Sequence, residues 1–158
     1  MNILNWINGK ECQPSNNGWL EKFAPHTGKV MSLVADSTAS DAVQAIGAAA
    51  DAFPAWSELT PVKRGQILAD IVNCMKQQAD TLAECIAVET GKPPQDAKGE
   101  VGGAIMQAEY FAGEGMRLYG RSLTSGMPGK YSHTVRQPRG IAGLIVPANT
   151  PIANIAWK

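Results

Sequence analysis

Residues 140–158, GIAGLIVPANTPIANIAWK, decide the fold class of this chain. An apolar run over 141–146 meets a loop in which two prolines flank an asparagine, and a helix-like pattern begins at residue 151. A strand that feeds a helix in this way is typical of α/β sheets, where ligands bind at the carboxyl ends of the strands. The stretch therefore predicts an α/β fold with a binding site at the loop. No parallel partner strand follows within the sequence, so we expect this site to be incomplete in the polypeptide.

The composition excludes several classes of function. The 14 basic residues balance the 14 acidic ones, whereas a nucleic-acid surface needs a cationic face. No stretch is apolar over the length needed to cross a bilayer, and the first residues lack the pattern of a signal peptide. We therefore expect no nucleic-acid partner, no membrane association and a cytoplasmic location.

The cysteines and histidines indicate neither a disulfide nor a metal site. Cys12, Cys74 and Cys85 show no CxxC or Cys/His spacing, which is typical of reduced thiols in a cytosolic protein. His26 and His133 lie far apart and match no metal-binding pattern. Two of the cysteines fall in an apolar helical stretch, where we expect them to be buried and unreactive. None of the three is expected to act as a nucleophile.

The first 36 residues predict a small β meander. Asn8-Gly9 is the strongest two-residue hairpin signal, and a turn over 25–28 separates two further strands. The strand-like runs cover residues 4–9, 19–24 and 30–35.

The following 83 or so residues predict a layer of three helices. Thr38 and Asp41 have the spacing of a capping box, and Pro54 is expected to end the first helix. A second helix is expected over 61–90 and a third over about 95–119. Glycines inside the third helix favour close approach between helices; they are Gly102, Gly103, Gly113 and Gly115.

Three further side-chain expectations follow from these patterns. Glu89 lies where the helix dipole opposes its charge, so we expect a structural ion pair, with Lys92 as the candidate partner. The tryptophans and methionines fall on apolar faces and are expected in the core. After the helical layer, residues 120–130 predict a loop, 131–137 a strand and 140–147 the final apolar strand.

Six motifs in the same order resemble the N-terminal portion of the NAD(P)-dependent aldehyde dehydrogenases. The helix over 108–120 favours the semialdehyde dehydrogenases within that family. The motifs are WINGK (6–10), APHTGKV (24–30), FPAWSELTPVKRGQIL (53–68), ETGKP (89–93), AEYFAGEGMRLYG (108–120), and RQPRGIAGLIVPANTP (136–151) with AWK (156–158).

The resemblance implies a nucleotide-binding α/β domain, a catalytic domain and a strand extension for oligomerisation. We accordingly expect an N-terminal β meander over 1–36 and a helical layer of the cofactor domain over 37–119. An oligomerisation-type loop and strand would cover 120–138. The first strand of the nucleotide-binding sheet would lie in 139–158.

The resemblance also implies a reaction. In the family, a cysteine thiolate attacks an aldehyde, hydrogen-bond donors hold the resulting oxyanion, NAD(P)+ takes a hydride, and a glutamate activates water. Only the oxyanion donor has a counterpart here, Asn149 in the Pro-x-Asn-x-Pro loop. From the residues alone, Asn149 also fits a simple turn position beside proline.

Cofactor contacts are implied for the same stretch. Ile145, Val146 and Pro147 match backbone positions that line NAD or NADP in the family, although the pattern alone also fits plain strand core. Ala148, the next residue, is a further candidate for a cofactor contact. Ala148 and Thr150 stand where the family usually has an aromatic pair, so we expect a different substrate tunnel and different packing beside the cofactor.

Lys158 matches a basic residue of the family near the cofactor. As the last residue of the sequence, it also fits a solvated chain end.

The sequence therefore predicts the N-terminal portion of an aldehyde dehydrogenase, with a small-molecule aldehyde as the substrate of the complete family. We expect this polypeptide alone to be inactive and to bind no cofactor by itself. An alternative is a non-catalytic interaction module, in which the edge of the strand over 131–137 pairs with a second copy or with an intact homologue.

Overall fold

The computed structural model describes residues 2–158, and its N-terminal part is built from short strands. A three-stranded sheet has the order β1-β5-β4, in which β5 runs parallel to β1 and antiparallel to β4. The hairpin β2–β3 turns at Asn8 and Gly9, whose φ angles of 54° and 74° match the turn favoured by Asn-Gly. The predicted N-terminal strands and the Asn8-Gly9 turn are confirmed, but the strands do not form one meander, because β1 pairs in parallel with β5 and the β2–β3 hairpin is a separate sheet. The bounds are β1 Asn2–Ile3, β2 Asn5–Ile7, β3 Lys10–Cys12, β4 Trp19–Phe23 and β5 Val30–Ala35.

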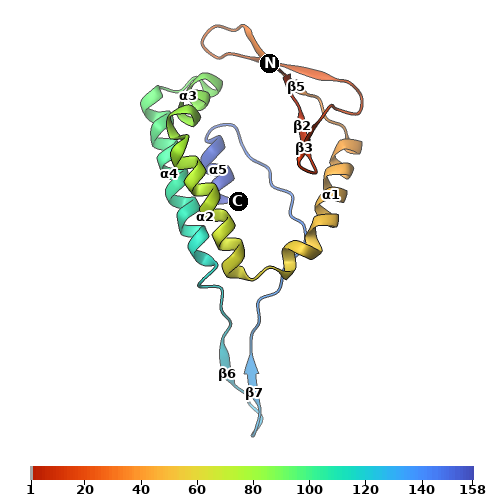
Figure 1. Ribbon diagram of the computed structural model, residues 1–158, viewed down its shortest axis with the longest axis vertical. Coiled ribbons are helices and arrows are strands. Elements are labelled where there is room, and N and C mark those ends of the chain that lie inside the picture. Colours follow the sequence, from red (N-terminus) through yellow and green to blue (C-terminus); the bar gives the residue numbers. More distant parts are fainter. Residues whose placement is uncertain (1) are drawn as a thin grey trace.

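Helix α1 (Ala39–Glu58) begins with the predicted capping box. Thr38 accepts from the Ser40 N–H, and the Asp41 carboxylate accepts from the Thr38 N–H at 2.7 Å. The expectation that Pro54 ends the helix is wrong, because α1 continues for four residues beyond it. Proline removes a single backbone donor, and Figure 1 shows α1 changing direction towards its C-terminal end rather than stopping.

The single helix predicted over 61–90 is two helices, α2 (Pro61–Gln77) and α3 (Ala79–Thr90). Gln78 breaks the helical path with φ −108° and ψ 16°. Its N–H still donates to the Cys74 carbonyl at 3.1 Å, so this carbonyl in the last turn of α2 keeps a partner. The break lets α3 take its own direction against the next helix, which the apolar stripe alone does not specify.

The core lies where α4 (Pro94–Glu114) meets its neighbours α2 and α3. Buried residues on α4 recur at intervals of three and four positions, as expected for one helix face. Most of them are alanines, so the neighbouring helices can approach closely. The buried apolar residues are Val72, Ala83, Ile86, Ala97, Val101, Ala104 and Ala108.

Two glycines mark the closest crossing of α2 and α4. A Cβ atom on Gly65 would lie 2.5 Å from the Ala112 carbonyl oxygen, and one on Gly115 would lie 2.5 Å from the Pro61 carbonyl oxygen. Close approach is thus confirmed at Gly115, one residue after α4 ends. It is wrong for Gly102 and Gly103, which face open space.

The second half of the chain leaves the helical body and returns to it. Strands β6 (Ser122–Thr124) and β7 (Tyr131–His133) pair antiparallel in a hairpin that projects away from the helices, opposite the N-terminal strands (Figure 1). The strand predicted over 131–137 is therefore shorter, and its partner lies in the predicted loop. The chain then returns to α5 (Pro151–Trp157), which packs against α4.

The strand predicted over 140–147 is not formed within residues 2–158. These residues carry no regular secondary structure and are exposed, because a strand needs a hydrogen-bonded neighbour and none lies beside them. The combination of strands and helices remains α/β, and the division at residues 36, 119 and 138 stays a prediction.

The expected burial of tryptophans and methionines is wrong for most of them. Trp6, Trp56 and Trp157 are exposed, as are Met106 and Met116, because the small core is filled by alanine and valine instead. In residues 2–158, none of the helices combines the length and apolar content that a membrane span requires.

Candidate functional site: the Asn149 loop

The loop that holds Asn149 is closed by the first turn of α5. Pro151 occupies the first helical position, where a missing N–H costs nothing. The Asn154 side-chain nitrogen donates to the Thr150 carbonyl at 2.9 Å and to the Thr150 hydroxyl at 2.7 Å. The carbonyl that follows Asn149 in the chain is therefore held by the helix that the loop begins.

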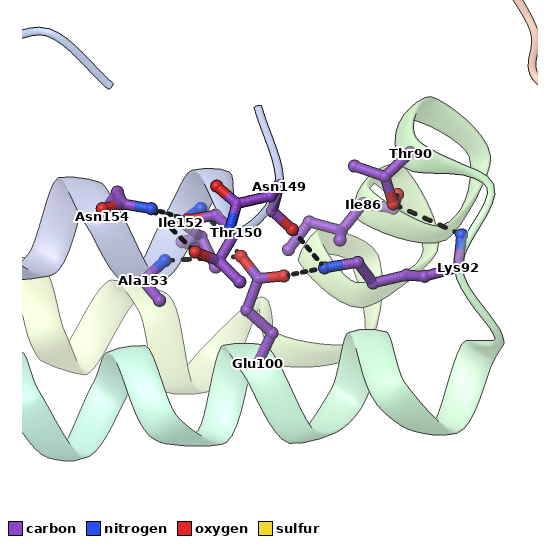
Figure 2. Close-up of polar contacts among 9 residues, drawn as sticks. All are labelled: Ile86, Thr90, Lys92, Glu100, Asn149, Thr150, Ile152, Ala153 and Asn154. Atoms are coloured by element: carbon purple, nitrogen blue, oxygen red, sulfur yellow. Dashed lines mark hydrogen bonds and ion pairs between the residues drawn. The ribbon is translucent and has the colours of Figure 1, made fainter. Parts of the chain in front are cut away.

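Glu100 of α4 reaches the same helix start from below, as Figure 2 shows. Its Oε1 accepts from the backbone N–H of Ile152 at 3.1 Å and of Ala153 at 3.5 Å. These N–H groups belong to the first turn of α5, where backbone donors have no partner within the helix. The carboxylate thus fastens α5 to α4.

Lys92 connects Glu100 to the loop. Its Nζ donates to the other carboxylate oxygen of Glu100 and, at 2.9 Å, to the backbone carbonyl of Asn149 (Figure 2). Lys92 follows α3 and the left-handed residue Gly91, with φ 75°. The Thr90 hydroxyl accepts from the Lys92 N–H at 3.4 Å and donates to the Ile86 carbonyl at 2.6 Å.

Asn149 itself is exposed. The contact with Lys92 uses its backbone carbonyl and not its side-chain amide. A neutral amide donor on a fixed backbone suits an oxygen atom that gains negative charge. The structure brings together Asn149, Lys92 and Glu100 from three parts of the chain.

The candidate cofactor residues lie along the extended segment before the loop. Ile145 is 89% exposed, and Val146, Pro147 and Ala148 are exposed with it. The Lys158 Nζ donates to the Ile145 carbonyl at 2.6 Å. Lys158 is thus solvent-accessible, as a chain end would be, but it also returns to this segment.

The cysteines are placed differently from the expectation. Cys74 and Cys85 are exposed, and Cys12 is half-buried. The expected burial is wrong because the inward faces of α2 and α3 are taken by Val72, Ala83 and Ile86. Within residues 2–158, no group of three or more His, Cys, Asp or Glu side chains could hold a metal ion.

Glu89 forms an ion pair, as expected, but with a different partner. Its Oε2 lies 2.7 Å from the Nζ of Lys22 in β4, whereas Lys92 turns to Glu100. The pair joins α3 to the N-terminal sheet. The partner was unpredictable from local spacing because Lys22 lies 67 positions away.

Glu100 is the site residue that sequence reasoning misses. A signal for it exists: Glu100 lies three positions after Ala97 and four before Ala104, on the buried face of α4. A charge on such a face requires partners. Lys92 lies in the quoted ETGKP motif, but the sequence does not connect it to the loop.

Asn149 is thus an exposed residue on the loop that opens α5. The chain belongs to the aldehyde dehydrogenase family, whose model matches residues 12–158. It is 36% identical over 156 residues to the alpha-ketoglutaric semialdehyde dehydrogenase of Bacillus subtilis, covering 98% of this chain and 32% of that protein. It is 36% identical over 152 residues to the NADP(+) succinate-semialdehyde dehydrogenase of Escherichia coli, covering 96% and 32%.

Solved structures agree with this assignment. A crystal structure of an NADP-dependent enzyme from E. coli matches with a TM-score of 0.93 at 34% identity, covering 98% of this chain and 32% of that one. A betaine aldehyde dehydrogenase from Staphylococcus aureus in complex with NAD+ matches with a TM-score of 0.92 at 28% identity, covering 98% and 32%. The chain therefore spans about a third of the length of the relatives it matches.

Proposed function

We propose that this chain supplies the oxyanion-stabilising loop and part of the cofactor-facing surface of an NAD(P)-dependent aldehyde dehydrogenase that acts on a semialdehyde. The observation that carries this proposal is the placement of Asn149, with its backbone tied down and its side-chain amide exposed. Family membership and the semialdehyde dehydrogenases among its relatives support the substrate class.

The side-chain amide of Asn149 donates a hydrogen bond to the oxygen that becomes negative when a thiolate adds to the aldehyde carbon. Such a donor is worth about 3 kcal/mol in the transition state when it is aimed in advance. Lys92 and Glu100 hold the backbone that carries it. Cys12, Cys74 and Cys85 lie on β3, α2 and α3, and none of them is proposed as the nucleophile.

NAD or NADP fits the groups that the extended segment offers. Ile145, Val146, Pro147 and Ala148 are exposed, and the Lys158 ammonium lies beside the Ile145 carbonyl. Peptide groups and a cation suit the hydroxyl and phosphate oxygens of a dinucleotide. We propose that these five residues would contact the cofactor, whose nicotinamide accepts the hydride when bound.

A chimera tests this proposal. Residues 2–158 replace the matched segment of the E. coli NADP(+) succinate-semialdehyde dehydrogenase, and NADPH formation is followed by absorbance. We expect Asn149→Ala to lower kcat by about 10²–10³ with a small effect on KM. Asn73→Ala, which removes an exposed amide from α2, serves as the matched control. An Asn149→Ala chimera that keeps the full rate would show that Asn149 is not the donor.

The 158-residue polypeptide is tested by itself. We propose that it does not oxidise semialdehydes in the presence of NAD+ or NADP+, because a lone donor has no oxyanion to stabilise. Nicotinamide absorbance is followed before and after all three thiols are alkylated. Turnover that disappears on alkylation would contradict this proposal and identify one of the thiols as a nucleophile.

A second candidate function is a non-catalytic interaction module. It is favoured by the projecting β6–β7 hairpin, where Leu123 and Tyr131 are exposed beside unpaired strand edges, and Val135 is exposed shortly after β7. The partner would be a second copy or an intact homologue. Size-exclusion chromatography with light scattering tests self-association, and a monomer at all concentrations would count against pairing with itself.

We also propose a cytoplasmic location, supported by the three free thiols. Fractionation of cells that express the tagged chain provides the measurement, and recovery in a membrane or secreted fraction would contradict it.

A further inference from the structure

We propose that Glu100 and Lys92 are positioning residues that fix the backbone of Asn149 and so aim its side-chain amide. Neither residue contacts the reacting atoms; both act through the loop. This inference rests on the proposed function of Asn149 for its catalytic meaning, while the physical link can be measured without any reaction.

The environment of Glu100 is the first argument. Its side chain is only 5% exposed, on a helix face otherwise lined by Ala97, Val101 and Ala104. A carboxylate is costly to bury unless donors surround it. Here two backbone N–H groups of α5 and one ammonium group supply them. An apolar residue would fill the same helix face, so the charge has a use beyond packing.

The bridging position of Lys92 is the second argument. Its side chain is 19% exposed, and one ammonium group contacts both the Glu100 carboxylate and the Asn149 carbonyl. Lys92 and Asn149 are 57 positions apart in the chain. Glu100 orients the ammonium, and the ammonium orients the carbonyl.

The peptide geometry of the loop is the third argument. Because a peptide unit is planar, holding the Asn149 carbonyl fixes the plane that joins Asn149 to Thr150. The Thr150 carbonyl is held in turn by Asn154. Two successive peptide planes are thus anchored on the C-terminal side of Asn149. The two planes meet at the Cα atom of Thr150 and restrain its dihedral angles, and the first plane also holds in place the Cα atom of Asn149, from which the side chain extends.

The test uses the 158-residue chain labelled with ¹³C and ¹⁵N. We expect Lys92→Met to shift the backbone carbonyl carbon and the side-chain amide signals of Asn149. Glu100→Gln should shift the same signals, because a neutral amide holds the ammonium less strongly. Glu109→Gln is the matched control. Like Glu100, Glu109 lies on α4 and pairs with a lysine, in this case Lys76 of α2, but this ion pair is half-exposed. The control variant should leave the Asn149 signals unchanged.

Unchanged Asn149 signals in both Lys92→Met and Glu100→Gln would overturn the proposal. If either single variant unfolds, the double variant decides, because it removes both charges together. A folded double variant with altered Asn149 signals supports positioning, whereas native Asn149 signals overturn it. A double variant that unfolds also overturns it, since the pair would then support the whole fold rather than the loop.

The outcome is independent of the chimera experiment. Asn149 signals that stay unchanged in the variants refute positioning even if Asn149 is the donor. A chimera that keeps its full rate after Asn149→Ala refutes the proposed function even if the link to Lys92 is present.

Discussion

Glu100 places a negative charge among small, buried apolar side chains, and this placement affects the stability of the fold. Buried ion pairs add little net stability over apolar replacements, but a single unpaired charge left in such a place is expensive. Among the ion pairs in residues 2–158, the Lys92–Glu100 pair is the most buried. The Lys76–Glu109 pair is half-exposed, and the Lys98–Asp80 pair is largely solvated.

A double-mutant cycle on this pair should therefore be strongly non-additive. We expect Lys92→Met alone to lower the free energy of unfolding by about 3–5 kcal/mol, since it leaves the Glu100 carboxylate without its cation. Adding Glu100→Gln should recover most of the loss. Urea titration followed by circular dichroism gives the four values. Additive effects would show that the pair is solvated in solution.

Gly65 is a position where the volume of a single added methyl group is expected to affect stability. Alanine is favoured over glycine inside a helix by about 1 kcal/mol. At Gly65, however, the new methyl group would meet the Ala112 carbonyl across the α2–α4 crossing. We expect Gly65→Ala to destabilise the chain by about 1–3 kcal/mol. Gly102→Ala, which faces open space on α4, should stabilise it instead. Thermal unfolding of both variants checks the opposite signs.

The N-terminus of α1 is stabilised by a carboxylate that is sensitive to acid. The pKa of Asp41 is held below its usual value, first by the hydrogen bond from the backbone N–H of Thr38; the backbone N–H of Ser15 adds to this at 2.9 Å. A carboxyl whose pKa is lower in the folded state stabilises the fold above its unfolded-state pKa, and this contribution is lost as the pH falls through its folded-state pKa.

We therefore expect part of the stability to disappear on acidification below about pH 4, the ordinary range of an aspartate. Asp41→Asn should lower stability at neutral pH and flatten the dependence in the acid range. Chemical unfolding of both proteins between neutral and acid pH provides the comparison. Parallel curves for the two proteins would mean that Asp41 does not titrate with folding.

Local signals in the sequence predict element boundaries well where a cap or turn is chemically specific. Thr38 with Asp41, Asn8-Gly9 and the helix start expected at residue 61 each place a boundary that the structure confirms. The sequence is less informative where tertiary packing decides. Proline at 54 is tolerated inside α1, and the break at Gln78 has no proline or glycine to announce it.

The candidate site was predictable in part for the same reason. The Asn149 loop follows from a local pattern, the strand-like run, the two prolines and the helix start. The tie from Lys92 to the loop is a contact across 57 positions, and no local pattern specifies it. The strand expected over 140–147 fails because residues 2–158 place no neighbour beside it, although the residues are those of a strand.

Across the molecule as a whole, protection from solvent should be uneven. Residues 139–147 are exposed and belong to no sheet, whereas α4 lies between α2, α3 and α5. We expect amide hydrogens in 139–147 to exchange fastest outside the chain ends and those of α4 slowest. Hydrogen exchange followed by mass spectrometry tests this order. Slow exchange over 139–147 in the monomer would mean that the segment is covered in solution.

The hydrogen bonds around Asn149 also bear on how the protein is made. Lys92 and Glu100 are synthesised before the loop, and Asn154 comes only five positions after it. Domains fold from their N-terminal side while the ribosome adds about 5–20 residues per second. Once residue 158 has left the exit tunnel, the contacts described for this loop are all available. All the partners that hold this loop therefore lie within about 60 positions of it, so it can take its shape co-translationally.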